Sequence, residues 1–82
     1  MNLYLISQNE NNDYDTYDSA VVAANTEDEA KATHPSGQKE WDGKGEEFGS
    51  WTNKENVSAS LVGVASQIFK TPGVICASFN AG

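Results

Sequence analysis

The chain has 82 residues, a formal net charge of −7 and one cysteine, which predicts a single small domain, residues 1–82, without a disulfide framework or a Cys-rich zinc site. Five lysines and no arginine exclude a nucleic-acid-binding surface, which needs a dense array of cationic side chains. No apolar stretch approaches the length of a membrane span, and the N-terminus lacks a signal-peptide pattern, so we expect a cytoplasmic protein.

Two apolar segments near the N-terminus predict the first two strands. Residues 3–6 have high β-propensity, and their unbroken apolar sequence predicts a strand covered on both faces. Residues 20–24 form the second apolar segment. The polar, Asn-rich residues 8–13 between them predict a loop. We therefore expect an antiparallel hairpin with an irregular tip.

Residues 26–32 predict a short helix that begins with a capping box. Thr26 can accept a hydrogen bond from the Glu29 amide, and the Glu29 carboxylate can reach back to the Thr26 amide. Acidic side chains in the first turn also favour the positive end of the helix dipole. The helix must end by His34, because Pro35 follows, and His34 would then cap its C-terminus.

The second half of the chain predicts a long loop and two more strands. Residues 35–53 hold both tryptophans beside several glycines, and a loop of this length in a small domain is usually functional. Residues 57–65 predict a third strand. Residues 74–79 predict a fourth, apolar on both faces and therefore central, in which Cys76 is expected to be buried.

The predicted fold class is α+β: a small four-stranded, mainly antiparallel sheet with one short helix, in the order β-β-α-long loop-β-β. One helix covers one face of such a sheet. The other face would need Trp41, Phe48 and Trp51 of the long loop as a lid, or a second copy of the chain. We favour the second copy, and so a homodimer, because the glycines and charges of the loop suit a lid poorly.

Charge and aromatic residues indicate where a partner would bind. Residues 1–30 hold seven acidic residues and no lysine, whereas residues 31–82 hold five of each. Such an acidic segment can steer a protein toward a basic surface, or it can serve solubility alone. Tyr and Trp dominate binding hot spots, although we expect at least two of the four candidate Tyr and Trp side chains to fill the core. The candidate binding residues are Asp13, Tyr14, Asp15, Tyr17, Asp18, Trp41 and Trp51.

Catalytic and metal sites are disfavoured by the residue spacing. Residues 11–22 align in part with a calcium-binding EF-hand loop, but Thr16 and Val22 hold the positions of its glycine and its bidentate glutamate. His34 is the only histidine, and no nucleophile motif accompanies it. We therefore expect no enzyme activity, no metal and no cofactor.

Three stretches of sequence resemble a group of small proteins encoded by phages and prophages. They are YDTYDSAVVAA at residues 14–24, HP at residues 34–35 and ASFNAG at residues 77–82. The resemblance implies an accessory protein that acts by stoichiometric interference with a host or defence component. It assigns no role to any individual residue.

These observations lead to a ranked set of functional hypotheses. The first is a non-enzymatic, phage-type accessory protein that binds a host protein with a basic surface. The alternative is an oligomeric sponge that holds a small nucleotide-like ligand between aromatic faces, although the negative charge and the absence of arginine disfavour an anionic ligand. The last is a small hydrolase that uses His34 with an aspartate.

Overall fold

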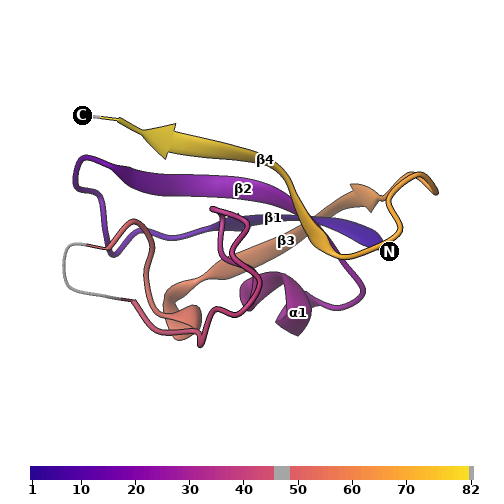
Figure 1. Ribbon diagram of the computed structural model, residues 1–82, viewed down its shortest axis with the longest axis horizontal. Coiled ribbons are helices and arrows are strands. Elements are labelled where there is room, and N and C mark those ends of the chain that lie inside the picture. Colours follow the sequence, from indigo (N-terminus) through magenta and orange to yellow (C-terminus); the bar gives the residue numbers. More distant parts are fainter. Residues whose placement is uncertain (46–48, 82) are drawn as a thin grey trace.

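The computed structural model describes residues 1–45 and 49–81, which form a four-stranded antiparallel sheet with one short helix on one face (Figure 1). The strand order is β3-β1-β2-β4. The α+β class and the β-β-α-long loop-β-β order are thereby confirmed. The elements are β1 (Asn2–Ser7), β2 (Thr16–Ala24), α1 (Glu27–Lys31), the 3-10 helix η1 (Lys54–Asn56), β3 (Ser58–Val64) and β4 (Gly73–Asn80).

The predicted hairpin forms the centre of the sheet. β1 and β2 pair from Asn2↔Ala24 to Ser7↔Ser19 without a break in register. β2 begins at Thr16, earlier than the apolar segment that predicted it, because pairing with β4 extends to this residue. Residues 8–15 form the irregular tip of the hairpin.

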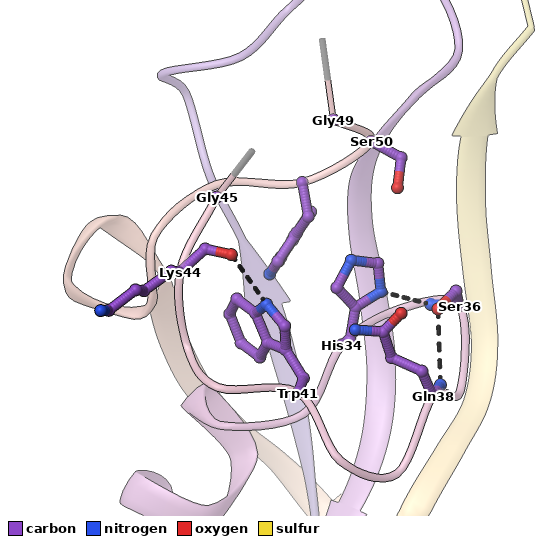
Figure 2. A pocket seen from close by; sticks show the side chains of 9 residues that line it. His34, Ser36, Gln38, Trp41, Lys44, Gly45, Gly49 and Ser50 are labelled. Carbon is purple, nitrogen blue, oxygen red and sulfur yellow. Dashed lines mark hydrogen bonds between the residues drawn. The ribbon is translucent and has the colours of Figure 1, made fainter. Parts of the chain in front are cut away.

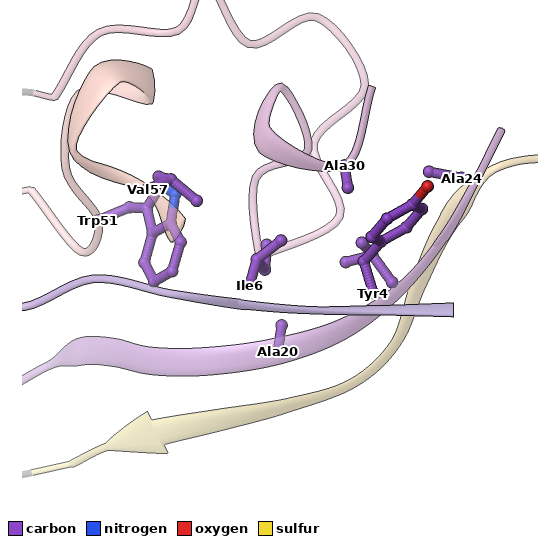
Figure 3. Packing of buried hydrophobic residues seen from close by; sticks show 8 residues of the cluster. Tyr4, Ile6, Ala20, Ala24, Ala30, Trp51 and Val57 are labelled. Atoms are coloured by element: carbon purple, nitrogen blue, oxygen red, sulfur yellow. The ribbon is translucent and has the colours of Figure 1, made fainter. Parts of the chain in front are cut away.

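The core lies on one face of the sheet (Figure 3). Alternate side chains of β1 and β2 point into it, and Ile6 and Val22 are completely buried; each such side chain contributes about 1.5–3 kcal/mol to folding. Ala30 of α1 and Trp51 of the long loop cover these side chains from the same side. The buried cluster consists of Tyr4, Ile6, Ala20, Val22, Ala24, Ala30, Trp51 and Val57.

The described parts of the long loop, residues 35–45 and 49–53, thus pack on the same face as the helix. The alternative in which the tryptophans form a lid over the opposite face is not observed, since Trp51 belongs to the core beside α1. Phe48, which was grouped with the tryptophans, lies outside the described residues. No helix or strand among the described residues covers the opposite face of the sheet.

The N-terminus of α1 is capped as predicted, with one difference. The Glu29 amide donates to Thr26 Oγ1 at 3.1 Å. The Glu29 carboxylate accepts from the amide of Asn25 at 2.8 Å, one residue before the predicted partner. The helix ends at Lys31 with Ala32 as its C-cap, so His34 lies beyond the helix and does not cap it.

Three expectations about burial in the strands are wrong. Residues 3–6 are covered on one face only, because Leu5 is 39% exposed on the face opposite Tyr4. β4 is an edge strand and not a central one. Cys76 on β4 is accordingly exposed. For β4, apolar residues on both faces indicated a central position. The strand also contains small residues such as alanine and serine, and these let the same sequence occupy an edge.

Candidate functional site

The tip of the β1–β2 hairpin is organised by one glutamine. Gln8 Nε2 donates to the carbonyl of Asn11 at 2.7 Å and to that of Tyr17 at 3.1 Å. Its Oε1 accepts from the amides of Glu10 and Asn11, both at 2.8 Å. These four hydrogen bonds define the conformation of a loop that contains no regular secondary structure.

The last turn of the tip places Asp15 in the left-handed region, with a φ of 60°. Aspartate tolerates this conformation better than most residues. Its amide donates to the Asn80 carbonyl at 2.6 Å, and Thr16 Oγ1 donates to the Asp13 carbonyl at 2.6 Å. The end of β4 and the start of β2 thereby anchor the turn.

Asn11 joins the hairpin tip to the long loop. Its Nδ2 donates to the carbonyls of Gly49 at 2.8 Å and Trp51 at 3.0 Å. The amide of Tyr17 adds a third link by donating to the Ser50 carbonyl at 2.8 Å. Residues 8–17 and 49–51 therefore form one continuous surface at this end of the molecule.

The acidic residues of this surface carry no ionic partner among the described residues. Glu10, Asp13, Asp15 and Asp18, hereafter the acidic tip, are all exposed. The one ion pair found among residues 1–45 and 49–81 joins Lys31 to Glu27 at 3.4 Å, within α1. Tyr14 stands between the acids of the tip and is 76% exposed. The tip thus presents concentrated negative charge around one accessible aromatic ring.

The other candidate aromatic residues lie behind the tip, on the core side of the sheet. The Tyr17 ring contacts that of Phe79 edge to face at a centroid distance of 4.8 Å, and lies 6.2 Å from the His34 ring. The Trp41 ring follows at 5.4 Å from His34. Such edge-to-face arrangements are favourable for aromatic pairs. These rings form a series from β4 to the long loop and do not join Tyr14 at the surface.

A hollow of about 250 Å³ lies between this series and the long loop (Figure 2). His34, buried at 8% exposure, accepts at Nδ1 from the Ser36 amide at 3.1 Å. Trp41 Nε1 donates to the carbonyl of Lys44 at 3.0 Å. The hollow is lined by His34, Ser36, Gln38, Trp41, Lys44, Gly45, Gly49, Ser50 and Trp51.

Trp51, which lines the hollow, carries an unusual polar group. The side chain is only 3% exposed, and its buried Nε1 donor has no hydrogen-bond partner among residues 1–45 and 49–81. Buried donors of this kind are rare because each loses its hydration without compensation. The backbone that follows Trp51 packs closely against Gly45, where a Cβ would lie 3.1 Å from the Asn53 nitrogen.

The seven predicted site residues therefore fall into two groups. Asp13, Tyr14 and Asp15 lie in the hairpin tip, with the exposed Asp18 nearby in β2. Trp41 and Trp51 line the hollow, and Tyr17 is partly buried against the core. The sequence analysis did not identify Gln8 and Asn11. The hydrogen bonds of Gln8 organise the hairpin tip, and those of Asn11 connect it to the long loop. The Asn-rich composition of residues 8–13 predicted a loop but carried no signal for its distant partners.

Comparisons with known proteins assign no family or function to the chain. Searches against protein-family models, curated proteins and solved structures found no match. Among the described residues, no three His, Cys, Asp or Glu side chains gather as a metal ion would require. No described helix has the length and apolar character to cross a membrane.

Proposed function

We propose that this chain is a non-enzymatic binding protein, of the kind phages use as accessory proteins, and that its acidic tip engages a basic surface on a host or defence protein. The observation that carries the proposal is the set of four exposed, unpaired carboxylates around Tyr14. The phage character follows from the sequence resemblance.

The physical properties of the tip suit protein recognition. Unpaired exposed charges of one sign accelerate encounter with an oppositely charged surface. Tyr14 offers a rigid ring with a polar hydroxyl, the type of anchor that contributes most at interfaces. The hydrogen bonds of Gln8 and Asn11 hold the loop in place before binding, which reduces the conformational entropy lost on association.

A defined cationic probe tests the proposal by two-dimensional amide NMR. On titration with a soluble peptide of repeated Lys-Gly-Ser units, we expect the largest shift changes at residues 10–18. Asp13→Asn or Asp18→Asn should each weaken binding, by up to about five-fold, because exposed ion pairs contribute roughly 0.2–1 kcal/mol. Tyr14→Ala should weaken it further.

Asp28→Asn provides the matched control, since it removes one exposed charge from α1, outside the tip. It should leave the affinity nearly unchanged. Equal weakening by Asp28→Asn and Asp13→Asn, with shift changes spread over both regions, would contradict the proposal. The peptide would then be attracted by the net negative charge of the chain and not by the acidic tip.

A second candidate function is supported by the hollow. The unpartnered Nε1 donor of Trp51 and the rings of Trp41 and His34 would suit a small planar ligand such as a nucleotide, with Lys44 available to an anionic group. Titration with adenosine monophosphate in the same NMR experiment separates the two functions. Shift changes confined to residues 34–45 and 49–51 would favour the sponge over the protein-binding function.

A further inference from the structure

His34 occupies the junction between α1 and the long loop. It is the only histidine of the chain, and its side chain is buried. The ring makes edge-to-face contacts with Tyr17 of β2 and with Trp41 of the long loop, at centroid distances of 6.2 and 5.4 Å. Histidine is the side chain that ordinarily changes charge between about pH 5 and 8. A buried histidine that joins a loop to the sheet can therefore make the position of the loop depend on pH.

The backbone around His34 determines which form of the ring fits. Nδ1 accepts from the Ser36 amide at 3.1 Å (Figure 2), which an imidazole nitrogen can do only while it keeps its lone pair. The same turn is closed by the amide of Gly37, which donates to the His34 carbonyl at 3.0 Å. A proton on Nδ1 would place two donors against each other. The observed turn therefore requires an unprotonated Nδ1.

The charges of the described residues around His34 disfavour a protonated ring. Lys44 lines the hollow together with His34 and would repel a positive imidazolium. Tyr17 offers an uncharged ring, and β4 behind it has no charged side chain. The Glu29 carboxylate of α1 is bonded to a backbone amide at the start of the helix, and the acids of the tip are exposed. Residues 46–48, which include two glutamates, lie outside the described residues.

We propose that His34 is a pH-sensitive anchor of the long loop, which holds residues 34–41 against the sheet while the ring is neutral and releases them when the ring is protonated. Protonation costs the Ser36 hydrogen bond and leaves a charge in a buried position, which is unfavourable until water reaches it. Opening of the loop supplies that water. The inference is independent of the function proposed for the acidic tip.

The remainder of the long loop is attached elsewhere, so the release should be local. The amide of Lys54 donates to the Gly43 carbonyl at 2.7 Å, and Asn11 holds the carbonyls of Gly49 and Trp51. Neither attachment involves His34. Acid should therefore change the surroundings of Trp41, which contacts the His34 ring, and leave Trp51 in the core. The hollow, which both tryptophans line, would open on the side of Trp41.

Two-dimensional NMR of the unmodified chain tests the proposal directly. The titration runs from about pH 7 to about pH 5.5, where ordinary carboxylates stay ionised. At the upper end, the imidazole nitrogens should show Nδ1 unprotonated and Nε2 protonated. The amides of Ser36 and Gly37 and the indole of Trp41 should then shift with the same midpoint as the ring, whereas the indole of Trp51 should move little. A protonated Nδ1 at about pH 7, or a ring that titrates without these shifts, would overturn the proposal.

The stability of the fold supplies a second readout. An unfolded chain takes up the proton that the anchored ring resists, so stability should fall as the pH falls. Between about pH 7 and 5.5, the equilibrium constant for unfolding in urea should rise by up to about eight-fold, the limit for one histidine that titrates near pH 6.5 only in the unfolded chain. An unchanged or falling constant would mean that the fold accepts the charged ring, contrary to the proposal.

His34→Asn and His34→Phe are the matched variants. The asparagine oxygen can accept from the amide two residues further on, as in an Asx turn, but the side chain does not titrate. Phenylalanine keeps an aromatic ring and lacks both the acceptor and the titration. Both variants should lose the pH response of the Ser36 amide, the Trp41 indole and the unfolding constant. A response that persists in either variant belongs to another group and would also overturn the proposal. If neither variant folds, the titration of the unmodified chain still decides.

Discussion

At the scale of single residues, the best-defined contribution is the N-cap of α1. Thr26 Oγ1 accepts from the Glu29 amide at 3.1 Å, and a helix of five residues has few other hydrogen bonds of its own. Thr26→Ala should lower the free energy of unfolding by about 1 kcal/mol, measured by urea denaturation. Thr26→Ser retains the hydroxyl and should cost far less. Equal losses in the two variants would show that the methyl group of Thr26, and not its oxygen, stabilises the helix.

The amide side chains that organise the hairpin tip could not be recognised from the sequence. Gln8 and Asn11 arrange the hairpin tip and its contact with the long loop, yet neither stands out from a polar, Asn-rich segment. Their carboxamides can donate and accept at once. Which backbone groups they reach depends on the fold and not on the neighbouring sequence.

At the scale of elements, Asn11 couples the hairpin tip to the long loop. Asn11→Ala removes two hydrogen bonds, to the carbonyls of Gly49 and Trp51, and should lower the free energy of unfolding by about 2 kcal/mol. Freed from this contact, the loop should admit acrylamide to Trp51. Fluorescence quenching in a Trp41→Phe background would report the change from Trp51 alone.

The neighbouring Asn12 supplies the control for this coupling. Its side chain makes only long bonds of 3.4 Å to Asn9, within the tip. Asn12→Ala should therefore leave both stability and quenching close to those of the unmodified chain. If Asn12→Ala matched Asn11→Ala, the effect would come from the tip itself and not from its contact with the long loop.

Sheet order is also an element-scale property, and here the sequence pattern misled. Residues 74–79 are mostly apolar on both faces, as a central strand would be, but β4 lies at the edge. The central positions belong to β1 and β2, the hairpin that forms from neighbouring segments. A strand's own sequence reports how much apolar surface it offers, and its neighbours decide how much of that surface is covered.

At the scale of the whole molecule, charge should set the response to salt. The chain carries a net charge of −7, and a single ion pair is found among its described residues. Self-repulsion should therefore destabilise the fold at low ionic strength. Raising NaCl to about 0.15 M shortens the Debye length to about 8 Å. We expect the free energy of unfolding to rise by about 0.5 kcal/mol, which raises the melting temperature by about 2–4 °C.

A fall in melting temperature over the same salt range would contradict this expectation, because it would mean that attractive charge pairs dominate. Sucrose at matched osmolality separates screening from preferential exclusion of the solute, since an uncharged osmolyte stabilises without screening. Measuring at low protein concentration keeps concentration-dependent association out of the comparison.

Several features of this protein could be predicted from local patterns in the chain. These are the α+β class, the β1–β2 hairpin, the cap of α1 and the concentration of acidic residues in the first half of the chain. Each follows from residues that are close together in the chain, so propensity, capping and loop composition suffice to predict it.

Which candidate residues lie near one another depends on tertiary packing. Tyr14 is exposed with the acids of the tip while Trp51 is buried in the core, although both are aromatic residues beside polar neighbours. The hydrogen bonds of Asn11 that join the hairpin tip to the long loop connect residues 38 and 40 positions apart in the chain. Contacts over such distances arise from the packing of a loop against the sheet, which the amino-acid pattern near either residue does not encode.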